Sequence, residues 1–332
     1  MTKAEELEAL FVEYKRLGID QQIDYDKFYL YSIITHSTAI EGSTVTEIEN
    51  QLLLDQGITS SGRTIVEQMM NLDLKAAYER CLIYASEHTQ ITVDILKELS
   101  SLVMKNTGST YSTALGEFSS AKGDLRLLNV TAGIGGNSYL SYAKVPSKLK
   151  EFCEELNIQR IEVGRKGIIE KYLMSFDAHY NLVTIHPWAD GNGRMSRLLM
   201  NMLQFENGLI PTKIRKEDKA EYIKALVETR EKDDINIFRD FMMDVMIGNL
   251  KQDILAFERS SEALPINPVK KEKSREKILK LISQNSSMTT AQLAAEIGIS
   301  AKAVEKHIAN LKKAGLLTRV GPDKGGHWEV HQ

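Results

Sequence analysis

The residues best suited to chemistry lie in one short segment, His186-Pro187-Trp188-Ala189-Asp190-Gly191-Asn192-Gly193-Arg194, with Arg197 close behind. Apolar residues at helical spacing precede and follow the segment, which predicts a tight loop between two helices. A helix N-terminus, with its unpaired N–H groups and positive dipole, favours anions, and two arginines add fixed positive charge. We therefore predict a polyphosphate site at the start of the second helix.

Two further side chains in the segment predict a reaction at that site. Histidine is the side chain best matched to general-base work near neutral pH, which makes His186 the candidate base. Asp190 supplies one carboxylate, which suits a Mg²⁺ that takes its other ligands from phosphate and water. Asp-Gly and Asn-Gly are also common turn residues. The combination of all these groups within 12 residues favours the functional interpretation over a plain turn.

The segment closely resembles the signature of the Fic (filamentation induced by cAMP) family, His-Pro-Phe-x-Asp/Glu-Gly-Asn-Gly-Arg-x-x-Arg. Every position matches except Trp188, where one aromatic residue replaces another. The resemblance implies a mainly α fold, a Fic-type helical bundle with a β-hairpin flap. It also implies a protein adenylyltransferase, which transfers AMP from ATP to a Ser, Thr or Tyr hydroxyl of a target protein and releases pyrophosphate.

The same resemblance implies a role for each matching residue. His186 would take the proton from the attacking hydroxyl, and Asp190 would hold Mg²⁺ on the phosphates. The residues implied to bind ATP are Gly191, Asn192, Gly193, Arg194, Arg197 and Asn201. Among these, the arginines would bind the β- and γ-phosphates and Asn201 would face the adenosine.

A flap and a built-in inhibitor are also implied. The candidate flap is Phe118 to Val130, in a Gly- and Ser-rich loop region, although the family's Gly-x-Tyr-Arg is replaced by Gly116-Glu117-Phe118-Ser119. A flap would pair with the extended target segment, whereas the alternative is a surface hairpin without a target role.

The hexapeptide Ser37-Thr38-Ala39-Ile40-Glu41-Gly42 matches the family's inhibitory motif, Ser/Thr-x-x-x-Glu-Gly/Asn. By resemblance, Glu41 would pair with Arg197 and take the space of the γ-phosphate. The alternative is a solvated glutamate at a helix end, with Gly42 as the stop. In some relatives this glutamate also assists removal of AMP from the target, and the sequence leaves that activity open.

Hydrophobic periodicity predicts the elements that position these residues. The clearest stripe is Ile169, Leu173, Phe176, Tyr180 and Val183, on a helix that must stop before Pro187. We divide the chain into an N-terminal helical region with the inhibitory helix (1–94), a Fic catalytic core (95–258), a Pro-containing linker (259–273) and a C-terminal module (274–332).

The C-terminal module resembles a bacterial winged helix-turn-helix domain, with three helices and a terminal hairpin. Its third helix would read a major groove. The candidate DNA-contacting residues are Ser300, Lys302, Lys306, His307, Arg319 and Lys324. Protein docking or dimerisation is the alternative use of such a module.

Charge separates the module from the rest of the chain. The net charge of −3 is the sum of two unequal parts. Residues 269–332 contain 12 Lys+Arg and 6 Asp+Glu, whereas the remaining 268 residues contain 30 Lys+Arg and 39 Asp+Glu. Any DNA would therefore bind the basic tail and not the acidic body.

Composition limits the remaining possibilities. Cys81 and Cys153 are far apart and predict buried thiols in a reducing compartment. The absence of a signal peptide or a long apolar stretch predicts a cytoplasmic protein without a membrane partner. The second hypothesis for the whole chain is a DNA-binding transcriptional regulator whose Fic body senses nucleotide. A UTP or phosphocholine donor, kinase activity, self-modification and a homodimer are left open.

Overall fold

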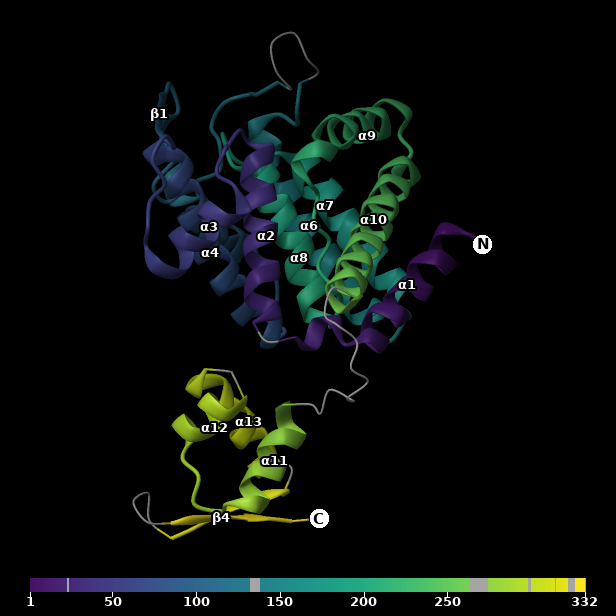
Figure 1. Ribbon diagram of the computed structural model, residues 1–332. Helices are drawn as coiled ribbons and strands as arrows, with labels where there is room; N and C mark the ends of the chain where they lie inside the picture. Colours follow the sequence, from purple (N-terminus) through teal and green to yellow (C-terminus); the bar gives the residue numbers. More distant parts are fainter. Residues whose placement is uncertain are drawn as a thin grey trace. The chain divides into compact units, whose positions relative to one another are not determined.

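The computed structural model describes residues 1–22, 24–131, 138–262, 274–297, 300–313, 315–321 and 326–331. The chain divides into two compact units, Met1–Arg259 and Ser260–Gln332 (Figure 1). Each unit has a hydrophobic core of its own. The mainly α fold class is confirmed, whereas the boundary predicted near residue 94 stays a prediction.

The first unit is a bundle of ten described α-helices. They are α1 (Lys3–Leu17), α2 (Tyr25–Ile40), α3 (Glu47–Gln56), α4 (Ile65–Ser86), α5 (Val93–Val103), α6 (Val145–Val163), α7 (Ile168–Ile185), α8 (Asn192–Glu206), α9 (Lys219–Lys232) and α10 (Ile235–Glu262). The predicted helix with the clear apolar stripe is α7, which ends two residues before Pro187 as expected.

Helix α8 lies in the middle of this bundle. It contacts α2, α4, α5 and α7, and its residues from Arg194 to Gln204 are all buried. A helix that is covered on every side is fixed by its neighbours. The first two turns of α8, which carry the signature arginines, are therefore held rigidly.

The loop region after α5 differs from the prediction. The strands are β1 (Thr110–Thr113) and β2 (Gly116–Ser119), paired antiparallel, so the hairpin precedes most of the predicted flap. The chain after β2 forms a short 3₁₀ turn (Ser120–Lys122), and further on its described residues Thr131 and Ser138 form an antiparallel bridge. Residues 118–130 therefore do not form one hairpin as expected, and the role of this segment as a flap stays a prediction.

Two residues explain this correction. Gly123 has φ of +71° and packs so closely on α5 that an added Cβ would lie 2.0 Å from the carbonyl oxygen of Lys97. It therefore fits the chain against a helix and does not turn a hairpin. Arg126 is buried and donates to the carbonyl of Leu128, so this part of the chain is folded around the arginine side chain.

The second unit contains α11 (Ser274–Gln284), α12 (Thr290–Ile297), α13 (Ala301–Lys313), β3 (Leu317–Val320) and β4 (His327–Val330). The strands pair antiparallel. Leu293, Val304 and Leu311 bring the faces of α12 and α13 into one core. Trp328 packs against that core. Its backbone N–H donates to the carbonyl of Ser286, and its indole N–H donates to the carbonyl of Met288. The predicted three helices and hairpin are confirmed.

Two smaller predictions concern the whole described chain. Cys81 and Cys153 are both free and buried. None of the helices in the described ranges is long and apolar enough to cross a membrane.

Candidate active site

The loop between α7 and α8 holds its histidine in an uncommon backbone conformation. His186 ends α7 with φ of +52°, a left-handed value that costs a non-glycine residue energy and persists where the surroundings enforce it. Arg126 enforces it here, because its Nε donates to the His186 carbonyl at 2.7 Å and its backbone N–H donates to the Pro187 carbonyl at 3.0 Å. The loop is thus built to present this side chain.

The imidazole of His186 has a defined tautomer. Nδ1 lies 3.2 Å from the carbonyl oxygen of Val183, which can only accept, so Nδ1 carries the hydrogen. Burial, together with the positive charges of Arg126 and Arg230, lowers the pKa of His186 to about 4. The ring is therefore neutral at pH 7, and Nε2 keeps the lone pair that a base needs.

The floor of the loop is held by Trp188 and Asn192. Trp188 is fully buried, and its indole N–H donates to the Gly123 carbonyl. The side chain of Asn192 both accepts from the Trp188 N–H and donates to the Trp188 carbonyl. Asn192 therefore closes the loop with its amide, and a ligand at this point would meet backbone groups.

Glycine is required at the start of α8. Gly191 has φ of +81°, and a Cβ there would lie 2.7 Å from Sδ of Met104. A Cβ on Gly193 would lie 2.7 Å from Oε1 of Glu41 and 3.1 Å from a nitrogen of Arg197. The first turn of α8 is thus in direct contact with charged groups, which a side chain at Gly193 would displace.

Arg194 is a buried cation with poor partners. Its side chain is 3% exposed, and its closest contacts are the sulfur of Met104 at 3.0 Å and the carbonyl of Val103 at 3.5 Å. Its Nε has no hydrogen-bond partner among the described residues. A buried guanidinium normally has anionic or hydrogen-bonding partners. Arg194 is therefore suited to an anionic ligand.

Arg197 has a carboxylate partner already. Its Nη2 lies 2.6 Å from Oε1 of Glu41, and the guanidinium also donates to the hydroxyl and the carbonyl of Ser37. Burial opposes ionisation of Glu41, but the charges of Arg197, Arg194 and Lys219 outweigh it and lower the pKa of Glu41. Glu41 is therefore ionised at neutral pH, and its carboxylate lies against the first turn of α8.

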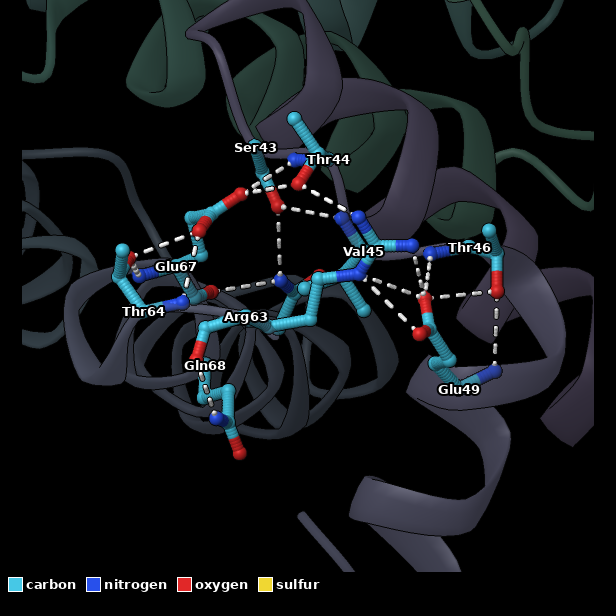
Figure 2. A network of polar contacts seen from close by, with 10 residues as sticks. Ser43, Thr44, Val45, Thr46, Glu49, Arg63, Thr64, Glu67 and Gln68 are labelled. Atoms are coloured by element: carbon cyan, nitrogen blue, oxygen red, sulfur yellow. Dashed lines mark hydrogen bonds and ion pairs between the residues drawn. The ribbon is translucent and has the colours of Figure 1, made fainter. Parts of the chain in front are cut away.

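Glu41 is fixed in place by the chain that follows it. It caps the end of α2, and Gly42 continues with φ of +106°. Figure 2 shows that the next residues enter a polar network, in which Thr44 donates through its N–H and its hydroxyl to Glu67 at 2.6 Å each. Arg63 joins the same Thr44 hydroxyl to Glu49 on α3. These bonds connect the segment after Glu41 to the first turns of α3 and α4.

Asp190 lies on the outer side of the loop, with its side chain 57% exposed. Its Oδ1 accepts from the Gly191 N–H at 2.6 Å and lies 3.7 Å from Arg194. Within the described ranges, no group of three or more His, Cys, Asp or Glu side chains could hold a metal. One exposed carboxylate fits a Mg²⁺ that takes its other ligands from phosphate and water.

Asn201 lies two turns further along α8, and its contacts differ from the expectation. Its Oδ1 accepts from the Tyr78 hydroxyl at 2.6 Å, and its Nδ2 donates to Gln204 and to the Thr212 carbonyl. The residue is 1% exposed. These bonds connect α8 to α4 and to the chain before α9, and the contact of Asn201 with adenosine stays a prediction.

Three neighbours of His186 were not predicted from the sequence. Arg126 binds its carbonyl, Tyr139 stacks on its ring at a centroid distance of 3.8 Å, and Arg230 lies over Tyr139. They come from the loop region and from α9, between 44 and 60 residues away in sequence. No local spacing connects Tyr139 or Arg230 to the signature, whereas Gly123-Asp124-Leu125-Arg126 keeps the glycine and the arginine of Gly-x-Tyr-Arg and could have indicated Arg126.

The candidate DNA-contacting residues occupy different parts of the second unit. Ser300 is exposed and caps α13 through the Ala303 N–H. On α13, Lys306 is exposed, His307 is half-buried and Lys302 is a further member of the helix. Arg319 on β3 lies 4.8 Å from the Trp328 ring centroid. Lys324 lies outside the described residues.

Comparison with known proteins agrees with this geometry. Residues 90–204 match the Fic/DOC family, and residues 271–318 match winged helix-turn-helix DNA-binding. Residues 90–204 form a Fic domain. The match includes α5, the loop region, α6, α7 and most of α8, which carry His186 and the two arginines, whereas Glu41 and Arg230 lie outside it. The C-terminal module is a winged helix.

Curated relatives carry the same domain. The chain is 28% identical over 203 residues to protein adenylyltransferase fic-1 of Caenorhabditis elegans, covering 60% of this chain and 36% of the relative. It is 27% identical over 254 residues to protein adenylyltransferase Fic of Drosophila melanogaster, covering 76% of this chain and 48% of the relative. The chain thus spans between a third and a half of these relatives.

Solved structures show the same fold. A Fic domain-containing signaling protein of Bacteroides thetaiotaomicron has a TM-score of 0.64 at 22% identity, covering 76% of this chain and 97% of its own. A Fic family protein of Desulfovibrio desulfuricans has a TM-score of 0.61 at 16% identity, covering 99% and 94%. At these identities the likeness concerns the fold alone.

Proposed function

We propose that this chain is a protein adenylyltransferase that transfers AMP from ATP to a Ser, Thr or Tyr hydroxyl of a target protein. The observation that carries the proposal is the pairing of a neutral, oriented His186 with two buried arginines on the first turns of α8. The relatives named above are adenylyltransferases, which supports the same reaction here.

The site supplies the parts that the reaction needs. The target hydroxyl oxygen attacks the α-phosphorus, and its proton passes to Nε2 of His186. The bond from the α-phosphorus to the bridging oxygen breaks, and pyrophosphate leaves. The first-turn N–H groups of α8 and the Arg194 guanidinium stabilise the charge on the phosphates. Mg²⁺, held through Asp190, neutralises phosphate charge when it is bound.

Glu41 would act as an inhibitor in the same site. Its carboxylate lies against Gly193 and Arg197. The terminal phosphates of ATP would bind the Arg197 guanidinium at the same position. Two anions cannot share that space, so ATP must displace Glu41 or bind without the Arg197 contact. We infer that the free protein is held at low activity and that a movement of α2 raises it.

Intact-mass spectrometry after incubation with ATP and Mg²⁺ tests the reaction. The protein itself serves as the first target, and a variant without the Glu41 carboxylate avoids the inhibitor. We expect an added AMP that is absent from His186→Ala. An adduct with the mass of a phosphoryl group would show kinase chemistry, and an adduct from UTP alone would show a different donor. Either result, or an AMP adduct that survives His186→Ala, contradicts the proposal.

A second activity, DNA binding, is supported by the match of residues 271–318. We propose that the exposed face of α13 contacts the major groove and that Arg319 contacts phosphate. Binding of a labelled duplex at low salt, followed as the salt concentration rises, tests this. If no complex forms at low salt, the proposed DNA contacts are rejected. A chain that binds DNA but attaches no AMP would support the alternative of a nucleotide-sensing regulator.

A further inference from the structure

Three side chains form a layered stack at the candidate base. The rings of His186 and Tyr139 have centroids 3.8 Å apart and planes 18° apart. On Tyr139, the guanidinium carbon of Arg230 lies 4.7 Å from the ring centroid. The three residues come from the end of α7, from the loop region and from α9. A cation above an aromatic ring is attractive, so Arg230 favours the ring position that covers His186.

The chain that carries Tyr139 is fixed to the histidine independently of the stack. The Tyr139 N–H donates to the Val130 carbonyl at 3.0 Å. Arg126 donates to the carbonyl of Leu140 and, through another nitrogen, to the carbonyl of His186 itself. One buried guanidinium therefore holds both the backbone of the base and the segment that supplies its stacking partner.

These contacts remove the rotational freedom of the imidazole. The Nδ1–H bond to Val183 fixes one edge of the ring, and the stack fixes the plane of the ring. Nε2 lies in that plane on the opposite edge, so its lone pair has one direction. A general base loses much of its effect when its acceptor atom is misaligned.

We propose that Tyr139, supported by Arg230, is a positioning residue that holds the imidazole of His186 in its working plane. The proposal rests on the function proposed above. It requires the aromatic ring of Tyr139 and not its hydroxyl, because the contact with His186 is made between ring faces. It also requires a cation at Arg230, because a neutral side chain would not attract the ring in the same way.

The stack also affects the charge state of the base. The charged groups that bear on His186 are Arg126 in the loop region, Arg230 on α9 and Asp190 after α7. Removal of the Tyr139 ring exposes the imidazole to water and leaves the charges in place. Since burial is the largest cause of the lowered pKa, that pKa should rise toward its ordinary value of about 6.5.

The test compares Tyr139→Phe, Tyr139→Leu and Arg230→Met. Tyr111→Leu is the matched control, because it removes a ring that stacks on Phe118 in the β1–β2 hairpin. Nitrogen NMR of the imidazole, in protein without nucleotide, reports the tautomer and the pKa of His186, with its signals assigned by their loss in His186→Gln. We expect Tyr139→Phe and Tyr111→Leu to match the parent protein. Tyr139→Leu should raise the pKa and mix the tautomers, and Arg230→Met should show a smaller change of tautomer.

Kinetics in the Glu41→Gly background give the second readout. We expect Tyr139→Leu to lower kcat for AMP transfer roughly 10- to 100-fold, with an unchanged KM for ATP. Unchanged imidazole signals in Tyr139→Leu would overturn the proposal, as would equal losses in Tyr139→Phe and Tyr139→Leu. The NMR arm needs no turnover, so it decides the proposal even if AMP transfer itself fails. If Tyr139→Leu does not fold, the tautomer of His186 in Arg230→Met decides it.

Discussion

The ion pair between Glu41 and Arg197 predicts how strongly the proposed inhibitor acts. The perturbation is Glu41→Gly, which removes the carboxylate and leaves Arg197 bound to Ser37 through its two other contacts. The pair is short, at 2.6 Å, and its guanidinium side is 3% exposed. A hydrogen bond between charged groups is worth about 1.5–3 kcal/mol. Since about 1.4 kcal/mol equals a factor of ten, the gain should be roughly 10- to 150-fold.

The assay is the initial rate of AMP incorporation at an ATP concentration below KM. Glu41→Gln should fall between the parent and Glu41→Gly, because it keeps the side chain but removes its charge. Glu87→Gly is the matched control, since Glu87 caps the end of α4 as Glu41 caps the end of α2. The rate of the control should equal that of the parent protein.

Two results would refute this reasoning. Equal rates for the parent and Glu41→Gly would show that the ion pair does not compete with ATP. A gain in Glu87→Gly of the same size would show that loosening any helix end activates the protein. The geometry predicts that the rate of AMP incorporation rises in the Glu41 variants alone, and that most of the rise comes from a lower KM for ATP.

Four further predictions rest on the same structure. Because burial lowers the pKa of His186 to about 4, kcat/KM should stay high down to about pH 4–5, whereas an acid limb near pH 6.5 would contradict the buried ring. In the unfolded chain His186 binds a proton below about pH 6.5, whereas in the folded protein it does so only near pH 4. Because the unfolded state binds the proton first, the free energy of unfolding should decrease as the pH falls from 6.5 to 4. Gly191→Ala should destabilise the protein by about 1–3 kcal/mol in a urea titration because of its left-handed φ. The control is Gly248→Ala within α10, where a Cβ meets nothing within 4 Å, and it should leave the stability unchanged or raise it by up to about 1 kcal/mol. Arg319→Ala should weaken DNA binding equally across sequences and reduce its salt dependence by about one counterion; an unchanged salt slope would place Arg319 outside the DNA interface.

Much of the fold was predictable because local periodicity is visible in one dimension. The stripe on α7 and the proline after it set both the helix and its end. The turn chemistry of the C-terminal module likewise predicted three helices and a hairpin. The hairpin was misplaced because Gly123 has the sequence pattern of a turn, while it lies in close contact with α5. Sequence does not show which surface a glycine approaches.

For the site, the sequence by itself determined which residue types are present and in what order. His186, Asp190 and the two arginines fall in one segment, so their proximity is fixed by chain geometry. Tertiary structure decided what each of them contacts. It placed Glu41 on Arg197, left Arg194 with poor partners, turned Asn201 into the core and brought Tyr139 onto His186. Such contacts join elements up to 156 residues apart, and they depend on how whole helices pack, which no local pattern of residues encodes.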